Sequence, residues 1–323
     1  MGYVLFGAGY YGKLMLKILD KKDIVCFCDN RVKEENKMKI DGIPVIPYKV
    51  LKNNYLGHNV VITTREPQNI MEISKQLNKD NIPFTFIDEI AHMKLQDDIE
   101  TYRRLNNRPS FQYDESRALF FPLDKYQPAG SVGGYFWQDI WGAQHVFEKK
   151  PAIHYDIGSR IDGFIAHLLS FGQSVRLLDI RPLDVFVPGM EFIQCDATNM
   201  EAVDDESIES LSALCSLEHF GLGRFGDPID PEACFKCFSA IPRKMKKGGN
   251  VYISVPIGKE HVEFHAHRVF YASTIINNFK GMDLVEYSAI HEDGVEKFID
   301  NIHKYDEYGE SMGVMGLFHF FKK

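Results

Sequence analysis

The sequence predicts an α/β protein made of two units, each with a mostly parallel sheet covered by helices. Short apolar runs alternate along the chain with segments whose apolar residues have helical spacing. Two of these runs, at 3–6 and 153–157, lead directly into glycine-containing turns that precede a helix. Strand, tight turn and helix in this order begin a nucleotide-binding unit, so the chain contains two candidate ligand sites.

The composition is that of a globular protein with room for two cores. The 323 residues are 45% hydrophobic and 25% charged, and the formal net charge is −8. This charge, without a dense basic block, excludes broad contact with a nucleic-acid backbone. No apolar run approaches the ~18 residues of a membrane span. No export signal follows Met1, so we expect a cytoplasmic protein.

The six cysteines are expected to be reduced. Cys26 and Cys28 lie in an apolar run, and Cys234 and Cys237 lie one helical turn apart. No second closely spaced pair completes a zinc set. We therefore interpret them as buried small hydrophobic residues.

Residues 1–93 form the first predicted unit. The run at 3–6 opens into a G-x-G-x-x-G turn and a helix, and the next run, 24–28, ends in an acid. Glycines for a tight turn and an acid that accepts from a ribose hydroxyl form the dinucleotide-binding pattern. About four strands are visible, half of a full dinucleotide site, so the unit holds a nucleotide or serves only for packing or dimerisation. The candidate ligand residues are Gly7, Gly9, Gly12 and Asp29.

Four short blocks of this unit carry a family resemblance: Phe6-Gly7-Ala8-Gly9, Phe27-Cys28-Asp29-Asn30, Gly42-Ile43-Pro44-Val45 and Val60-Val61-Ile62. They resemble the N-terminal domain of bacterial sugar O-acyltransferases, and similar domains are fused to methyltransferases in surface-glycan pathways. The resemblance implies a Rossmann-like domain that holds a nucleotide-linked sugar through the glycines and the acid named above. The left-handed β-helix repeats of those acyltransferases are absent from this sequence, so acyl transfer is not implied.

Residues 94–150 are the least regular part and are interpreted as a linker or lid. A glycine-rich turn at 127–134 precedes a segment, 135–141, that holds both tryptophans. Aromatic faces stack on sugar rings, so one interpretation is a lid over an acceptor. The favoured interpretation is a helix whose Trp137 and Trp141 pack on the second unit, because aromatic residues at helical spacing usually belong to a core.

Residues 151–323 form the second predicted unit. One helix is expected over 231–246, with a glycine cap at Gly248-Gly249. Alternating strands and helices imply a doubly wound sheet that binds ligands at the carboxyl ends of its strands. The expected strands are 153–157, 174–178, 191–195, 211–214, 250–255, 284–287 and 317–321.

Three aspartates lie at the carboxyl ends of the first three strands of this unit. Asp156, with the Gly158 turn, is expected to face the charged amino-acid end of a ligand, directly or through water. Asp179 is placed to accept from both ribose hydroxyls, and Asp196 to receive an adenine amine. Each acid alone is equally well explained as a helix cap, but three in this order are harder to explain in that way.

Four blocks of the second unit carry a second resemblance: Tyr155-Asp156-Ile157-Gly158-Ser159-Arg160, Leu178-Asp179-Ile180-Arg181-Pro182, Glu218-His219-Phe220-Gly221-Leu222-Gly223-Arg224 and Ser254-Val255-Pro256-Ile257-Gly258. They resemble the class I S-adenosylmethionine-dependent methyltransferases, and more closely an uncharacterised methyltransferase-like domain family. The resemblance implies S-adenosylmethionine as cofactor and a seven-stranded sheet whose last strand is antiparallel. The implied cofactor residues are Asp156, Gly158, Ser159, Arg160, Gly163, Asp179, Ile180, Asp196, Ala197 and Ser216.

The first turn departs from the resembled family, because Arg160 and Asp162 stand where further glycines are usual. These side chains narrow the pocket, or else Arg160 pairs with the carboxylate of the cofactor.

Methyl transfer to a sugar hydroxyl needs a base that takes the proton. His219 is the first candidate because the loop after the fourth strand borders the methyl group in the resembled fold, and His265 and His267 follow it. The alternative for His219 is a structural role in its loop. Asp227 and Asp230 would add carboxylates for a divalent ion, but we favour a site without metal.

The sequence thus predicts an S-adenosylmethionine-dependent methyltransferase that O-methylates a sugar, either nucleotide-linked or part of a surface-glycan precursor. Its expected partner is a small-molecule or glycan acceptor, and a homo-oligomer is compatible with a dimerising first unit. One alternative is a catalytically inactive binding or scaffold protein in glycan biosynthesis. The other is an NAD-dependent oxidoreductase that uses the segment from Gly7 to Asp29.

Overall fold

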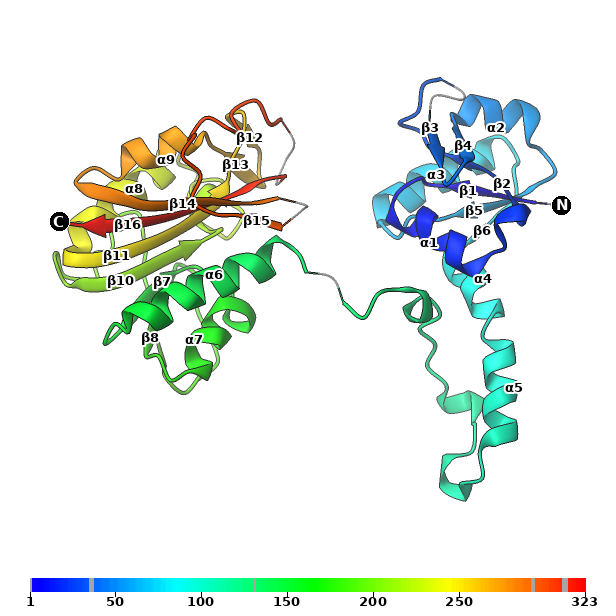
Figure 1. Cartoon of the computed structure of the whole chain (residues 1–323), viewed down its shortest axis with the longest axis horizontal. Coiled ribbons are helices and arrows are strands. Elements are labelled where there is room, and N and C mark those ends of the chain that lie inside the picture. Colours follow the sequence, from blue (N-terminus) through cyan, green and yellow to red (C-terminus); the bar gives the residue numbers. More distant parts are fainter. Residues whose placement is uncertain (1, 35–37, 131, 292–293, 310–312) are drawn as a thin grey trace. The chain divides into compact units, whose positions relative to one another are not determined.

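The computed structural model describes residues 2–34, 38–130, 132–291, 294–309 and 313–323, and the chain divides into two units between residues 131 and 132 (Figure 1). The stretch at 94–150, interpreted above as a linker, is therefore shared between the two units. Among the described residues, no helix has both the length and the apolar composition needed to cross a membrane.

The first unit is a six-stranded sheet in the order β3-β4-β2-β1-β5-β6, parallel except for β3. The strand β3 is not apparent from sequence because it is short and two of its three residues are exposed. The strands are β1 Tyr3–Phe6, β2 Ile24–Cys28, β3 Met38–Ile40, β4 Ile43–Ile46, β5 Asn59–Ile62 and β6 Phe84–Phe86. The helices are α1 Tyr10–Ile18, η1 Lys21–Asp23, α2 Tyr48–Asn54, α3 Pro67–Lys79, α4 Ile87–Met93, α5 Gln96–Leu105, η2 Pro109–Phe111, η3 Glu115–Arg117 and η4 Asp124–Tyr126.

The second unit contains the predicted doubly wound sheet, in the order β15-β14-β16-β11-β10-β7-β8-β9. The last strand, β16, is antiparallel to both β11 and β14, as the sequence predicts. An eighth strand, β15, extends the edge as a hairpin with β14. The strands are β7 His154–Ile157, β8 Val175–Asp179, β9 Met190–Gln194, β10 Ile208–Leu214, β11 Met245–Pro256, β12 His261–Glu263, β13 His267–Val269, β14 Met282–His291, β15 Gly294–Glu296 and β16 Met315–Lys322. The helices are α6 Gly134–Lys149, η5 Ile161–Ile165, α7 Ala166–Ser170, η6 Leu217–His219, α8 Ala233–Lys244 and α9 Ala272–Asn278.

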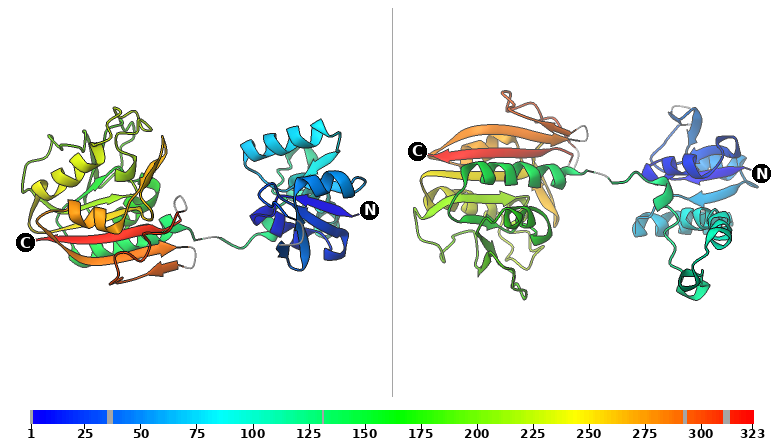
Figure 2. Two further views of the ribbon diagram at one scale, coloured as in Figure 1. Left: turned by 90° about the horizontal axis from the view of Figure 1, so that it is seen from above. Right: turned by 60° about the horizontal axis from the view of Figure 1, so that its bottom comes forward.

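Helices cover both faces of the larger sheet. Helices α6 and α7 lie on one face, and α8 and α9 lie on the other (Figures 1 and 2). The helical segment after the Gly158 turn has apolar residues at helical spacing. Three of them, Phe164, Ile165 and Leu168, are buried in the core on the α7 side of the sheet. Cys234 and Cys237 of α8 are buried in the other core, which fits their interpretation as small hydrophobic residues.

The predicted glycine cap of the helix over 231–246 is wrong. Helix α8 ends at Lys244, and β11 begins at the next residue, Met245. Gly248 has φ +82° inside this strand. The pairing of β10 with β11 shifts in register between Ile208 and Ser210, so this glycine belongs to a strand irregularity.

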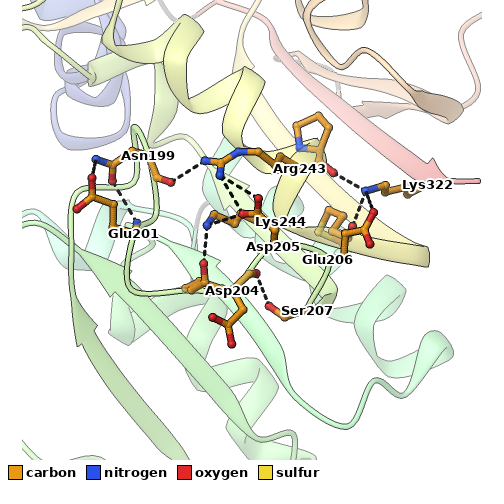
Figure 3. Close-up of polar contacts among 12 residues, drawn as sticks. Asn199, Glu201, Asp204, Asp205, Glu206, Ser207, Arg243, Lys244 and Lys322 are labelled. Carbon is orange, nitrogen blue, oxygen red and sulfur yellow. Dashed lines mark hydrogen bonds and ion pairs between the residues drawn. The ribbon is translucent and has the colours of Figure 1, made fainter.

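Ion pairs and carbonyl contacts hold the start of β10 to the end of α8 (Figure 3). The ammonium of Lys244 is buried, donates to the Val203 carbonyl and lies 2.8 Å from an Asp205 carboxylate oxygen. The same Asp205 carboxylate accepts from Arg243 at 2.9 Å. These contacts lie in the segment just before β10, at the edge of the sheet opposite to the one where the parallel strands end.

Helix α6 is attached to the sheet by a buried polar group. The carboxylate of Glu286 on β14 accepts from Trp141 Nε1 at 3.1 Å and lies 3.1 Å from His145 Nε2. Burial alone would raise the pKa of Glu286, but hydrogen bonds from His145, Ser288 and Trp141 outweigh it and lower the pKa to about 2. The aromatic helix therefore packs as core, which is the interpretation favoured from sequence.

We expect Glu286→Ala to lower the free energy of unfolding of the second unit by about 3 kcal/mol, because it leaves a buried imidazole and an indole N–H without their acceptor. Denaturant unfolding followed by tryptophan fluorescence measures this, since both tryptophans lie in α6. Glu201→Ala, at an exposed glutamate, is the control. A loss no larger than that of the control would contradict the role of Glu286.

Candidate functional site

A cavity of about 780 Å³ opens at the carboxyl ends of the parallel strands of the second unit. Its walls come from the loops after β7, β8, β9 and β10 and from the first turns of α6. The strand order reverses between β7 and β10, and ligands of doubly wound sheets bind at this type of reversal. The volume is in the range of small-molecule sites.

The turn after β7 is closed by Asp156. Its carboxylate is fully buried and accepts from the Ser159 backbone N–H and hydroxyl, both at 2.9 Å, and from the Ser212 hydroxyl. Burial raises the pKa of Asp156 to about 6, although these hydrogen bonds oppose the rise. Asp156 is not among the described residues that line the cavity, so its observed role is to shape the turn, and a contact with the ligand through water stays a prediction.

The glycines of this turn bring polar groups close to the cavity. Gly158 has φ +73°, and an added Cβ would lie 3.2 Å from Ser216 Cβ. At Gly163 an added Cβ would lie 2.6 Å from a carboxylate oxygen of Asp139, so a larger residue here would displace the Asp139 side chain. Both glycines and Ser216 line the cavity, as predicted.

Arg160 and Asp162 pair with each other at the rim. Arg160 Nη2 lies 2.6 Å from Asp162 Oδ2, and both side chains are exposed while they line the cavity. Because both side chains are largely exposed to solvent, the pair does not fill the cavity at the strand ends.

Asp179 ends β8 and lines the cavity with Ile180. Its carboxylate accepts from Arg181 through the backbone N–H at 2.9 Å, Nε at 2.9 Å and Nη2 at 2.6 Å. The Arg181 guanidinium also lies 4.6 Å from the centre of the Phe225 ring. This arginine, which the sequence analysis did not single out, is a cavity residue.

Asp196 and Ala197 follow β9 and lie in the cavity wall. Asp196 accepts from the Thr198 backbone N–H at 2.8 Å and is otherwise exposed, whereas Ala197 is buried. Ile180 and Ala197 thus give this end of the cavity apolar surface beside a carboxylate.

His219 is the predicted catalytic histidine that lines the cavity. Its Nδ1 lies 2.6 Å from the Ala266 carbonyl oxygen, which can only accept, so Nδ1 carries the proton and Nε2 is free to act as a base. Burial lowers the pKa of His219 to about 4, so the ring is neutral at physiological pH. A neutral imidazole can accept a proton, as a general base must. The lowered pKa, however, makes His219 a weak base.

His265 and His267 are not among the described residues that line the cavity. They belong to the β12–β13 segment, where His265 is exposed and His267 is buried, with its Nε2 3.5 Å from Glu263. The cavity therefore gives no support to the expectation that they act as catalytic bases.

Glu218 is a buried acid that the sequence analysis missed. Both carboxyl oxygens lack a hydrogen-bond partner among the described residues, and Oε1 lies 3.5 Å from His219 Nε2. Burial raises the pKa of Glu218 to about 8. In the sequence, Glu218 could have been identified as a candidate because it is an acid within an apolar run and next to the candidate base His219.

Helix α6 supplies three further cavity residues, Tyr135, Gln138 and Asp139. Burial raises the pKa values of Tyr135 and Asp139. The same helix buries Trp141 in the core, so one helix both packs and lines the site.

The loop 221–227 covers one side of the cavity and is held by Asp227. This carboxylate accepts from the backbone N–H groups of Gly221 at 2.6 Å and Phe225 at 3.2 Å. Asp230 instead pairs with Lys236 at 2.6 Å. Over the ranges that the structure describes, no three His, Cys, Asp or Glu side chains converge as a metal site.

The predicted ligand glycines of the first unit follow β1, beside the reversal point between β1 and β5, and Asp29 follows the neighbouring strand β2. Gly7 has φ +121°, and its carbonyl accepts from the Thr63 hydroxyl at 2.8 Å. At Gly12 an added Cβ would lie 1.9 Å from that carbonyl oxygen, whereas at Gly9 it would meet nothing within 4 Å. Gly12 is thus needed for packing, and Gly9 faces open space.

Asp29 repeats the arrangement of Asp179. It accepts from Arg31 through the backbone N–H at 3.0 Å, Nε at 2.9 Å and Nη2 at 2.8 Å. Unlike Asp179, it also accepts from the Ala8 backbone N–H at 3.0 Å, which ties it to the glycine turn.

A model for a family described as "Caenorhabditis protein of unknown function, DUF268" matches residues 190–313. No curated protein matches the chain.

Several solved structures are similar to more than half of the chain. A Burkholderia thailandensis 1,6-didemethyltoxoflavin-N1-methyltransferase with bound S-adenosylhomocysteine is 14% identical, with 58% of this chain and 79% of its own covered and a TM-score of 0.42. The glycopeptide N-methyltransferase MtfA is 10% identical, with 58% and 96% covered and a TM-score of 0.40. The [4+2]-cyclase SpnF is 11% identical, with 57% and 81% covered and a TM-score of 0.41.

We expect Glu218→Gln to change how stability depends on pH. The folded state raises the Glu218 pKa from 4.5 to about 8, so its contribution is fully present below pH 4.5 and is lost as the pH rises through 8. The variant should therefore lose less stability than the wild type between about pH 5 and about pH 9. Melting temperatures across this range measure the effect, and Glu201→Gln should keep the wild-type slope. Parallel curves for Glu218→Gln and the wild type would refute the shift.

Proposed function

We propose that the protein is an S-adenosylmethionine-dependent methyltransferase whose second unit holds the cofactor in the cavity described above. The observation that carries the proposal is the meeting of three strand-end features at one reversal point: the Gly158 turn, Asp179 and Asp196. In this assignment Asp179 accepts from the ribose hydroxyls and Asp196 receives the adenine amine. Ile180 and Ala197 supply apolar surface for the base.

The polar groups of the cavity fit the remaining parts of this cofactor. The hydroxyl of Ser216 is buried, lines the cavity and has no hydrogen-bond partner among the described residues, so it has a bond to offer a ligand. Arg160 at the rim suits the carboxylate of the amino-acid end. Six aspartates against four arginine and lysine side chains line the cavity, an excess of acid that favours a cationic ligand.

Bound S-adenosylmethionine would supply an activated methyl group, so the chain mainly has to position the acceptor. His219 then takes the proton of an acceptor hydroxyl through Nε2. We propose a sugar as the acceptor, nucleotide-linked or part of a surface-glycan precursor, with the first unit holding its nucleotide at the Gly7–Gly12 turn.

Binding of S-adenosylmethionine and S-adenosylhomocysteine to the full chain, measured by calorimetry, tests the proposal. We expect Asp179→Ala to weaken both by about tenfold or more, because charged hydrogen bonds to two hydroxyls contribute about 1.5–3 kcal/mol each. Asp29→Ala is the matched control, since it removes the same aspartate–arginine arrangement from the other unit. No binding of either ligand by folded protein would overturn the proposal.

The role of the first unit is tested at its glycine turn. Gly9→Ala should fold normally, because the added methyl group meets nothing within 4 Å, yet it should reduce the affinity for a nucleotide sugar that approaches the turn. Titration with a panel of nucleotide sugars measures this. Gly12→Ala is the contrasting variant, and we expect it to destabilise the unit by its collision with the Gly7 carbonyl. Equal affinities of Gly9→Ala and the wild type would place nucleotide binding elsewhere.

A further inference from the structure

Glu218 lies directly behind the cavity wall, in the short helix η6 after β10. Its side chain is fully buried, and its carboxyl oxygens have no hydrogen-bond partner of ordinary geometry among the described residues, although the Cys215 thiol lies close enough to interact with them. A buried polar group without a partner lowers the stability of the folded state. Its presence therefore suggests that the group has a function. The titratable and charged groups around it are Cys215, His219 with Nε2 at 3.5 Å, Tyr135, Arg224, and Arg268, whose guanidinium donates to the Glu218 carbonyl.

The side chains of Cys215, His219 and Tyr135 beside Glu218 are neutral near pH 7. Burial raises the pKa values of Cys215 and Tyr135 and lowers that of His219 to about 4. Glu218, with a pKa raised to about 8, holds its proton under the same conditions. Cys215, Ser216 and His219, all within three residues of Glu218 in the sequence, line the cavity.

We propose that Glu218 exchanges a proton in step with the charge on the cofactor sulfur. It releases its proton when the positively charged sulfonium enters the cavity, and it regains one when that sulfur becomes a neutral thioether. The physical reason is that a nearby positive charge favours the ionised form of a buried acid. The inference rests on the proposed function.

The exchange also gives the acceptor proton a destination. A lone pair of the acceptor oxygen forms the new C–O bond, and the electron pair of the broken C–S bond stays on sulfur. The hydroxyl proton passes to His219 Nε2 and from there to the Glu218 carboxylate, 3.5 Å away. The site thus ends neutral at both groups, and the weak base His219 does not have to retain the charge.

Calorimetry of the full chain in buffers of different ionisation enthalpy tests this inference. S-adenosylmethionine and S-adenosylhomocysteine share the same amino and carboxylate groups and differ in the charge on sulfur. Near pH 7 the wild type should therefore release about one proton more on binding S-adenosylmethionine than on binding S-adenosylhomocysteine. Its affinity for S-adenosylmethionine should rise as the pH approaches 8, while that for S-adenosylhomocysteine should not follow this rise.

Two variants assign the proton. Glu218→Gln should bind both ligands with equal proton release, whereas Glu206→Gln, an exposed glutamate just before β10 (Figure 3), should keep the wild-type difference. Asp139 lines the cavity and also has a raised pKa, so Asp139→Asn is the competing variant. A difference that survives in Glu218→Gln and disappears in Asp139→Asn would overturn the inference.

The outcomes separate the two proposals. Equal proton release for the two ligands in the wild type, with both bound, overturns the role of Glu218 and leaves the cofactor assignment intact. Failure of both ligands to bind overturns the proposed function and this inference with it. The pH dependence of the wild-type affinities decides the matter without relying on any variant.

Discussion

The site of the second unit depends on the hydrogen bonds that the buried carboxylate of Asp156 accepts. This carboxylate closes the turn after β7 through Ser159 and reaches across to Ser212 on β10. Ser212 in turn contacts His154 Nε2 at 2.8 Å, and His154 Nδ1 lies 2.8 Å from Ser210. Burial lowers the pKa of His154 to about 3, so the carboxylate is the charged member of this group. The two strands that flank the reversal point are therefore joined by side chains as well as by the sheet, and the cavity opens where they separate.

Much of the fold follows from periodicity in the sequence. Strand-length apolar runs ending in an acid at Asp179 and Asp196 predicted both the strands and the edge that carries the cavity. The sequence pattern gave a wrong prediction where strand pairing sets the end of a helix. The glycine pair after α8 was interpreted as a helix cap, although both glycines lie within β11. The short edge strands β3 and β15 contain too few buried residues to be recognised from sequence.

The site was less predictable because burial and side-chain direction are not encoded locally. The same residue type, an aspartate at the carboxyl end of a strand, lies in the cavity wall at Asp179 and under the turn at Asp156. The histidines after β11 were assigned by proximity in sequence, whereas in the structure they belong to the β12–β13 segment and are not among the described residues that line the cavity. Glu218 and Asp139 acquire their chemical character from desolvation, which only the packed structure provides.

The two units share one local arrangement. In each, an aspartate at the end of the second strand accepts hydrogen bonds from the guanidinium of an arginine two residues later. Under the proposed function, Arg181 of the second unit would compete with the ligand, because a ribose would have to share the Asp179 carboxylate with charged donors that are already in place. The net gain from ribose binding is then the difference between two sets of hydrogen bonds. The demethylated cofactor would face the same competition, so Arg181 would weaken the binding of both forms of the cofactor alike.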